Sequence, residues 1–522
     1  MDNESILEDN KPQIKGIEHW STKLANEVIS KKSPPFVITG GMTTSGPAHL
    51  GTVCEFLYPS VIKKSIEALG HDIKFYFVGD ILDAFDSIPE ELNAYSETLK
   101  AELGKPLART LDPKGCHNSF GEHYLMQAVD IMHLLNIDIN VIRATQLYTD
   151  GSFDVYTKKY LQNEDIVRDI VARTSGRESK DFASWSPIMP ICQNCGRIAT
   201  TRVIQHNDTE YEYACDKDVG YVKGCGHSGK NDIRDHEYKL QWRLHWSAWQ
   251  AWFRTSIEGS GVDHMTKGGS KDTSFAVLKD FFNIEPPVYY KYGFVLFHGK
   301  KYSKSKGIGV SAADIVKLIP PELLIYMLTL PNIEANKDID PDGEKLIRVY
   351  EDIERISKLN VPENRADAKK LNVYKLLIKK LPWKAPFLDI LMNFQVYKDF
   401  EKVGDIVNDK LGAEYLSKYI EEWLHMGYAP ERYNFSVSYD SKITVNKEAV
   451  RSFIDELGSD MSPEDIHALV YKIAKDKGVD AKELFKSLYN GIINKDTGPR
   501  FGKLAYAIGI SNIKNILTKA IE

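Results

Sequence analysis

The sequence has few of the features that mark secreted or membrane proteins. It holds six cysteines in 522 residues, too few for a disulfide framework. No apolar run approaches the roughly 20 residues of a membrane span, and residues 1–5 contain neither a basic nor an apolar signal region. We therefore expect a cytoplasmic protein without a membrane partner.

An excess of positive charge is also absent. Lys and Arg total 67 against 73 Asp and Glu, for a net charge of −6. This balance argues against a protein that wraps DNA, and we expect no DNA partner, but it leaves room for a local basic groove that binds a partner the size of tRNA. The 43% hydrophobic and 27% charged residues are ordinary for a globular protein, and the length predicts two to four domains.

Short apolar runs alternate with amphipathic stretches in the first third of the chain. Residues 36–39, 75–78 and 139–142 are strand candidates, while 49–69 and 122–135 have the length of helices. Strands separated by helices predict an α/β fold with a parallel sheet. Such sheets bind ligands at the carboxyl ends of their strands.

The amino-acid composition changes twice in the rest of the chain. Residues 185–235 hold four cysteines and many polar residues, which indicates an insertion around a metal. Beyond about residue 340 glycine becomes rarer and helical periodicity dominates. We therefore place a first domain at 1–340, with the insertion inside it, and a helical region at 341–522.

One helix of that region is predicted in detail, at residues 463–477. Ser462 is a good N-cap, Pro463 suits the first helical position, and Asp465 stands at the capping-box distance. Gly478 supplies a C-terminal stop.

The first chemical motif runs from Gly41 to Thr52 and links a predicted strand to a predicted helix through small, hydroxylated residues. Small residues let a backbone approach phosphate closely, and the N-terminus of a helix offers free N–H groups and a positive dipole end. His49 can donate a hydrogen bond to a phosphate oxygen. The alternative is a tight turn in which His49 only caps the helix.

The second motif spans residues 299–307 and contains four lysines with interleaved serines. Lysine places a point charge on phosphate and serine adds hydrogen bonds, so the segment suits a loop that clamps a polyphosphate. The alternative is a solvated surface loop, as most lysine runs are.

Together the motifs resemble the HIGH and KMSKS signatures of class I aminoacyl-tRNA synthetases, in the expected order. The resemblance implies a Rossmann-type catalytic domain and catalytic roles for His49, Lys301 and Lys304. It also implies ATP-binding roles for Ser45, Gly46, His49, Gly51, Thr52, Ser303, Lys304 and Ser305.

Further segments narrow the resemblance to class I lysyl-tRNA synthetase. Residues 239–243 resemble its K-L-x-W-R segment and 263–273 its D-H-x-x-x-G-G-S-x-D-T segment. Residues 112–124 and 287–290 resemble two more of its segments. The likeness extends from about residue 17 to 310 and more weakly beyond. It implies that lysine is bound by Gly41, Thr43, Trp242, His264 and Tyr290.

The positive charge of a lysine ammonium in such a pocket needs favourable contacts that replace its hydration. Trp242 and Tyr290 offer ring faces worth about 0.5–2 kcal/mol each, although aromatic core is the simpler interpretation of both. A carboxylate should complete the site, since burying an unpaired ammonium is costly. Asp80, Asp83 and Asp235 are candidates, and the sequence does not choose between them.

The chain departs from the family pattern at three points. Thr52 replaces the last histidine of HIGH, and Tyr302 replaces the methionine of KMSKS. The stretch 79–83 has fewer carboxylates than the family's D-D-Y-D pattern.

Four cysteines of the insertion have spacings that suit a metal: Cys192, Cys195, Cys215 and Cys225. Four thiolates around Zn²⁺ make a closed structural site, and C-x-x-C is the usual half-site. The second pair is more widely spaced than usual, and His227 is an alternative ligand to Cys215. The remaining alternative is unliganded cysteines.

The resemblance implies ATP-dependent attachment of lysine to tRNA(Lys) through a lysyl-adenylate, with Mg²⁺ accompanying ATP and the helical region binding the anticodon. Residues 495–500 form a plausible basic turn in that region. Three alternatives stay open: a glutamyl or arginyl synthetase of the same class, a nucleotidylyltransferase, and a non-catalytic tRNA-binding paralogue.

Overall fold

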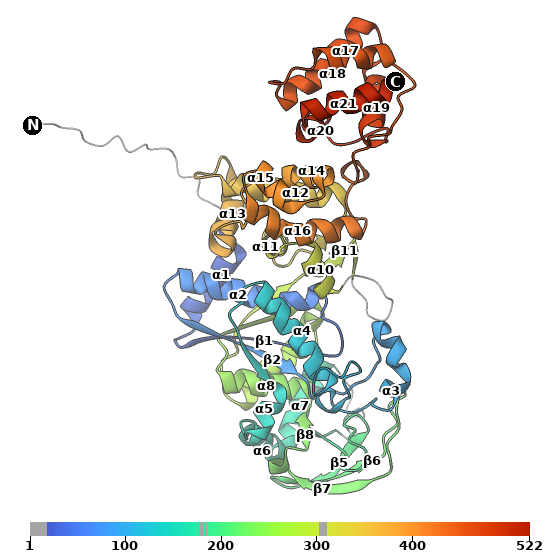
Figure 1. Ribbon diagram of the computed structural model, residues 1–522. Coiled ribbons are helices and arrows are strands. Elements are labelled where there is room, and N and C mark those ends of the chain that lie inside the picture. The colour runs from blue at the N-terminus through green and yellow to red at the C-terminus, as the bar shows by residue number, and fades with distance from the viewer. Residues whose placement is uncertain (1–17, 177–181, 183–184, 302–310) are drawn as a thin grey trace, which may run out of the picture. The chain divides into compact units, whose positions relative to one another are not determined.

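The computed structural model describes residues 18–176, 182, 185–301 and 311–522 (Figure 1). The chain divides into two compact units. Unit 1 comprises Met1–Val316, Leu324–Ile339 and Val361–Lys379, and unit 2 comprises Lys317–Leu323, Asp340–Asn360 and Lys380–Glu522. In the described part of the chain, no helix combines the length and the apolar character that crossing a bilayer requires.

Unit 1 is built around a five-stranded parallel sheet in the order β10-β9-β1-β2-β3. Its strands are β1 (Phe36–Thr43), β2 (Ile73–Asp80), β3 (Asn140–Arg143), β9 (Ile257–Gly261) and β10 (Val288–Tyr292). The predicted strands lie within or overlap β1, β2 and β3, so the prediction of an α/β fold with a parallel sheet is confirmed. The strand order reverses between β1 and β9, which marks the topological switch point where such sheets bind ligands.

Two helices lie on opposite faces of this sheet: α2 (Leu50–Ala68) and α8 (Trp242–Phe253). Successive residues of a strand point to opposite faces. A Cβ at Gly40 would stand 3.0 Å from the Glu55 carbonyl oxygen of α2, whereas one at Gly41 would stand 3.0 Å from the Trp249 ring of α8. The glycine pair therefore lets both helices pack closely at the end of β1.

The other elements of unit 1 surround the sheet. The helices are α1 (Trp20–Lys31), α3 (Ser96–Lys100), α4 (Phe120–Leu134), α5 (Ala144–Thr149), α6 (Asp154–Gln162), α7 (Glu164–Ser175), α9 (Ser270–Ala276) and α13 (Arg365–Val373). A small sheet combines β11 (Val295–Phe297), β12 (Lys300–Lys301) and β13 (Lys337–Ile339). The helices predicted at 49–69 and 122–135 match α2 and α4 to within two residues.

Two small antiparallel sheets lie between α7 and α8 in the chain. One pairs β4 (Ile188–Pro190) with β8 (Tyr238–Leu240), and the other contains β5 (Thr201–His206), β6 (Glu210–Cys215) and β7 (Ser228–Asp232). Cys215 ends β6, and the other three cysteines of the predicted metal site lie in the loops that connect these strands.

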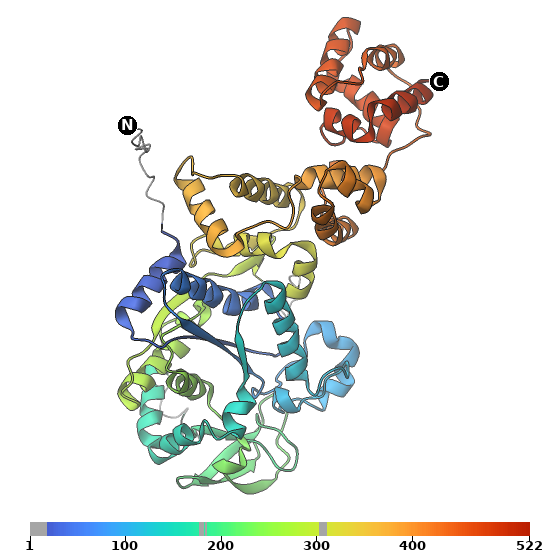
Figure 2. The ribbon, with the colours of Figure 1, turned by 60° about the vertical axis from the view of Figure 1, so that its left-hand side comes forward.

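Unit 2 is helical, and its later helices form the orange and red part of the ribbon in Figure 2. Its helices include α12 (Gly343–Ser357), α14 (Phe387–Tyr397), α15 (Phe400–Ile406), α16 (Lys410–His425), α17 (Lys447–Glu456), α18 (Pro463–Lys477), α19 (Ala481–Ile493), α20 (Phe501–Ile508) and α21 (Ile510–Ile521). Two helices near the boundary between the units are α10 (Ala312–Leu318) and α11 (Pro321–Thr329).

Helix α18 confirms the detailed prediction at 463–477. The Ser462 hydroxyl accepts the N–H of Asp465 in a capping box, and Gly478 ends the helix with φ 64°. Ile466 and Val470 are fully buried in a core shared with α17 and α19–α21, so the apolar face of α18 belongs to the interior of this helical group.

Candidate active site

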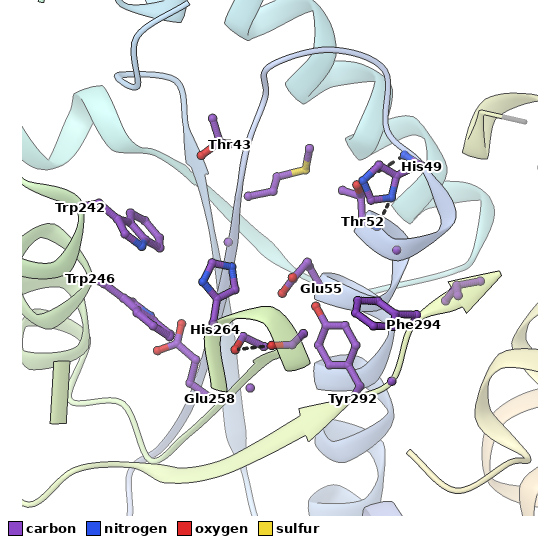
Figure 3. A pocket seen from close by; sticks show the side chains of 18 of the residues that line it. Thr43, His49, Thr52, Glu55, Trp242, Trp246, Glu258, His264, Tyr292 and Phe294 are labelled. Atoms are coloured by element: carbon purple, nitrogen blue, oxygen red, sulfur yellow. Dashed lines mark hydrogen bonds between the residues drawn. The ribbon is translucent and has the colours of Figure 1, made fainter. Parts of the chain in front are cut away.

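A cavity of about 520 Å³ lies at the carboxyl ends of β1 and β9, at the switch point of the sheet (Figure 3). This volume is in the range of small-molecule sites. Seven residues predicted from the two halves of the site line it together: Gly41, Thr43, His49, Gly51, Thr52, Trp242 and His264. The first motif and the later residues Trp242 and His264, about 200 positions apart in the sequence, therefore line one cavity.

The first turn of α2, where the sequence predicts phosphate binding, forms one side of the cavity. His49 is the N-cap, and its Nδ1 accepts a hydrogen bond from the Thr52 N–H at 3.2 Å (Figure 3). In return, the Thr52 hydroxyl oxygen accepts a hydrogen bond from the His49 N–H at 3.4 Å. Thr52, which replaces the last histidine of HIGH, thus completes a capping box. Ser45 and Gly46 lie in the preceding turn, outside the residues that line the cavity.

The aromatic side of the cavity comes from α8. Trp242 stacks on Trp246 at 5.7 Å between ring centroids, and its Nε1 donates to the Ser270 hydroxyl at 3.3 Å. Trp249 meets Trp242 edge-on at 5.7 Å. These contacts hold the indole planes along one wall.

Tyr290 stands apart from the other predicted lysine-binding residues. It is 5% exposed and is not among the residues that line the cavity. Its ring lies against β9, where a Cβ added to Gly259 would stand 2.3 Å away. Tyr292, two residues along the same strand, lines the cavity instead.

Two glutamates that the sequence analysis did not single out line the cavity, Glu55 of α2 and Glu258 of β9 (Figure 3). Burial raises the pKa of Glu55 to about 8; the Tyr292 hydroxyl opposes this shift, and the charge of Glu258 adds to it. Burial raises the pKa of Glu258 to about 7, against hydrogen bonds from Gln250 and, at 3.2 Å, from Trp249 Nε1. No ion pair within the described residues joins either carboxylate to a lysine or arginine.

Glu258 could have been recognised from the sequence as a site residue, because it is a charged residue inside an otherwise buried strand. The run 257–261 reads as a short strand, and a glutamate there must face a polar space or a cation. The sequence points to Glu55 less clearly. Only the periodicity of α2 would place its side chain near the HIGH-like turn at the start of that helix.

The three aspartates considered as substrate partners have different places. Asp80 is 1% exposed and pairs with the buried Lys239 at 2.7 Å. Asp83 also pairs with Lys239, accepts a hydrogen bond from Thr43 and lines the cavity. Asp235 accepts the N–H of Asp232 at 2.9 Å in the insertion and does not line the cavity.

The KMSKS-like segment is described only where it begins. Lys301 ends β12, which pairs with β11 through Leu296, and Val295 of β11 lines the cavity. The predicted residues Ser303, Lys304 and Ser305 lie outside the described residues.

The four cysteines of the insertion form one group, with all sulfurs within 4.8 Å of one another. Cys192 Sγ lies 3.7 Å from Cys225 Sγ, and Cys195 Sγ lies 3.7 Å from Cys215 Sγ. A tetrahedral Zn²⁺ with bonds of about 2.3 Å spaces its sulfur ligands about 3.8 Å apart, so the residues fit that ion. His227 is not a member of the group.

The wide spacing of the second cysteine pair has a local explanation. The Gly226 N–H donates to the Cys215 carbonyl at 2.9 Å, so the chain folds back onto Cys215. A Cβ at Gly224 would stand 2.2 Å from the same oxygen, and only glycine fits there. This turn brings Cys225 beside Cys215 despite the nine intervening residues.

Comparison with known proteins gives consistent matches. A family model described as tRNA synthetases class I (K) matches residues 18–380. A lysine–tRNA ligase of Archaeoglobus fulgidus is 30% identical over 96% of this chain and 100% of its own length. One of Thermoplasma acidophilum is 29% identical over 95% of this chain and 98% of its own.

Among solved structures, a glutamate tRNA ligase from Elizabethkingia meningosepticum is 13% identical, with a TM-score of 0.43 over 93% of this chain and 99% of its own. The family model covers most of the chain, and the A. fulgidus relative matches over nearly all of it. On these two sequence matches, the chain belongs to the class I tRNA synthetases of the lysine (K) type.

Proposed function

We propose that this enzyme attaches L-lysine to tRNA(Lys) in two ATP-dependent steps. The observation that carries the proposal is the pair Glu55 and Glu258. Both carboxylates line a cavity beside an aromatic wall, and no cation within the described residues pairs with them. An ammonium group is the ligand that would let these carboxyls ionise, since a buried carboxylate needs a positive partner.

The lysine substrate would lie across the cavity. Its side-chain ammonium would pair with Glu55 and Glu258, beside the ring of Trp242. Its α-ammonium would face Asp83, which Thr43 and Lys239 hold in place. Gly41 and His264 complete the lysine set that lines the cavity, whereas Tyr290 packs against Gly259 of β9 and stays outside it.

ATP would bind on the side of the α2 N-terminus. The turn with Ser45, Gly46 and His49, followed by Gly51 and Thr52, would hold its phosphates. Lys301, Ser303, Lys304 and Ser305 belong to the segment that would neutralise pyrophosphate as it departs. Mg²⁺ would accompany the nucleotide and offset phosphate charge.

The reaction needs no protein nucleophile. An oxygen of the lysine carboxylate attacks the α-phosphorus of ATP, and the bond to the bridging oxygen of pyrophosphate breaks, which yields lysyl-adenylate. A ribose hydroxyl of the terminal tRNA adenosine then attacks the lysyl carbonyl, and AMP leaves. Positioning and charge stabilisation supply the catalysis.

The rest of the molecule would serve the tRNA and the fold. The helices of 341–522 would bind the anticodon stem and loop, with residues 495–500 among the contacts. The four cysteines would hold a structural Zn²⁺, because four protein ligands leave no open coordination position.

The deciding experiment is ATP–pyrophosphate exchange with each of the twenty amino acids. Exchange that depends on lysine alone supports the proposal. Exchange that depends on arginine or glutamate would reassign the enzyme within its class. Exchange without any amino acid would indicate a nucleotidylyltransferase, and tRNA binding without exchange would indicate a non-catalytic paralogue.

A further inference from the structure

A second cavity, of about 450 Å³, lies in unit 1 along the second half of α2 and outside the active-site cavity. Residues of α2, of the connection between α4 and β3, and of the turn after α13 line it. None of the motifs that carry the family resemblance includes these residues, and the proposed reaction does not use them.

Positive charge exceeds negative charge around this cavity. Three lysines and two carboxylates line it: Lys63, Lys64, Lys379, Glu67 and Asp138. Lys63 Nζ donates to Glu67 Oε1 at 2.7 Å and to Asp138 Oδ2 at 3.1 Å, so one lysine pairs with both carboxylates. Among the residues that the structure describes, no carboxylate forms an ion pair with Lys64 or Lys379.

The environment of Lys64 is unfavourable for its positive charge. The side chain is partly buried, and burial, followed by the charge of Lys379, lowers the pKa of Lys64. The charge of Glu67 opposes this shift without cancelling it. An anion in the cavity would replace the lost hydration of the ammonium and would reduce the repulsion between the two lysines.

The backbone of Lys379 is strained. Its φ is 66° and its ψ −47°, and its N–H donates to the Tyr374 carbonyl at 2.7 Å to close the π-helical turn Tyr374–Ile378. Residues with a Cβ rarely adopt a positive φ, and glycine would be more favourable there. Residues strained in this way cluster at ligand-binding positions, and Lys379 lines the cavity.

The charges indicate a phosphate group. A phosphate monoester carries about −1.5 to −2 charges at pH 7, which matches the ammonium groups of Lys64 and Lys379, whereas a carboxylate would neutralise only one of them. Lysine binds phosphate as a point charge, without the flat bidentate geometry that arginine offers to carboxylates.

The size and the rim of the cavity favour a small organic phosphate over a nucleic acid. The volume of about 450 Å³ exceeds that of one phosphate ion, and Leu377 and Ile378 line the cavity beside the lysines. The side chains of Asp138 and Glu67 are 93% and 43% exposed. These carboxylates would repel the further phosphates of an RNA backbone.

We propose that this cavity binds the phosphate group of a small phosphorylated molecule between Lys64 and Lys379, with the organic part of the molecule against Leu377 and Ile378. Helix α2 contributes to both cavities, with Glu55 in the active site and Lys64 in the second. The two cavities share no lining residue, so this binding does not rest on the proposed function.

The test is protection of Lys64 from acetylation, with phenyl phosphate as the probe. The full-length protein is treated with sulfo-NHS acetate, and tandem mass spectrometry of its peptides gives the acetylation rate of each lysine. Phenyl phosphate at about ten times its Kd should slow the acetylation of Lys64 by about tenfold, and inorganic phosphate should protect it at higher concentrations. Lys74, an exposed lysine of β2 that does not line the cavity, should react at an unchanged rate.

Two variants separate this cavity from other anion sites. Phenyl phosphate should raise the Tm of the unmodified protein by about 1–3 °C relative to sodium chloride of equal ionic strength. Lys64→Met keeps an unbranched side chain without the charge and should remove most of this shift, whereas Lys64→Arg keeps the charge and should retain it. Without the probe, Lys64→Met should unfold at the same temperature or higher, because it removes an unpaired ammonium.

Equal acetylation of Lys64 with and without phenyl phosphate would overturn the proposal, as would equal Tm shifts in the unmodified protein and in Lys64→Met. Protection of Lys64 by a short RNA but not by phenyl phosphate would also overturn it. Lysine-dependent pyrophosphate exchange by the unmodified protein tests the proposed function separately, since neither measurement requires exchange activity.

Discussion

The hydroxyl of Thr43 donates a 2.6 Å hydrogen bond to the carboxylate of Asp83. Both residues line the cavity, and Asp83 is anchored from behind by the buried Lys239. The end of β1 and the segment after β2 are thereby locked together. An interaction between two cavity residues thus depends on a buried lysine that does not line the cavity.

We predict that Thr43→Val weakens the use of lysine. The change removes the donor to Asp83 but keeps the shape of the side chain, and a hydrogen bond to a charged group is worth about 1.5–3 kcal/mol. Pyrophosphate exchange at varied lysine should show kcat/KM lowered by about 10–100-fold. Thr43→Ser keeps the hydroxyl and should stay near the unmodified value; equal losses in both variants would contradict the role of the bond.

We predict that Glu55→Gln and Glu258→Gln each raise the Kd for lysine by about 10²-fold, because an ammonium would lose a carboxylate in a desolvated site. Calorimetric titration with lysine measures the effect. Glu354→Gln is the control: this carboxylate accepts hydrogen bonds from Trp383 and the Phe387 N–H in the other unit, so lysine affinity should not change. Unaltered lysine binding in both cavity variants would remove these glutamates from the site.

We predict that lysine binds more tightly as the pH rises from about 6 to about 8.5. The pKa values of Glu258, about 7, and Glu55, about 8, keep these carboxyls protonated at the acidic end, whereas the ammonium of lysine stays charged up to about pH 10. Titrations across this range measure the trend. Affinity that falls over the range would contradict it.

The same raised pKa values predict how stability depends on pH. The folded, lysine-free chain keeps protons on Glu55 and Glu258 that the unfolded chain releases above its usual pKa of 4.5. Their contribution to the free energy of unfolding therefore falls between about pH 4.5 and pH 8. Lysine should raise the Tm more at pH 8.5 than at pH 6, and Glu55→Gln should reduce that difference.

We predict that Trp242→Ala weakens lysine binding by about 3–30-fold, the value of a partly desolvated cation–π contact. Trp252 provides a matched control, because it belongs to the same helix, is 44% exposed and does not line the cavity. Trp252→Ala should leave the lysine Kd unchanged. Equal effects of the two substitutions would indicate a general disturbance of α8.

We predict that His49→Asn keeps the capping of α2 but loses the contact to phosphate. Asparagine is a good N-cap, so α2 should keep its stability to within about 0.5 kcal/mol, and thermal unfolding measures this. The rate of lysine-dependent pyrophosphate exchange should nevertheless fall by about 10²-fold, as for loss of one contact to developing charge. An exchange rate that survives the change would leave His49 a capping role alone.

Local sequence was enough to predict the strands β1, β2 and β3, the helices α2, α4 and α18, and the motif positions, but not β9 and β10. The caps of α18, Ser462 and Gly478, act within a few residues of the helix that they end. The strand-to-helix turn at His49 is likewise defined by neighbours in the chain. The segments 239–243 and 263–273 could also be matched to the family pattern from the sequence, because each is one continuous stretch.

The partners of charged groups could not be predicted in this way. Asp80 and Asp83 had equal standing in the sequence, but the fold places Lys239, more than 150 residues away, against both. Asp80 is therefore fully occupied, whereas Asp83 also reaches the cavity. Which carboxylate is available depends on long-range packing.

The sequence by itself determined the alternation of strands and helices, the glycine-rich exit of β1 and the set of four cysteines in the insertion, because these depend on residue type and short spacing. Only the tertiary structure decided that Glu55 and Glu258 share a cavity and that Tyr292 rather than Tyr290 faces it. The physical reason is that burial and electrostatic pairing are properties of surfaces that meet in space, and the strand order that brings β9 beside β1 joins segments over 200 residues apart.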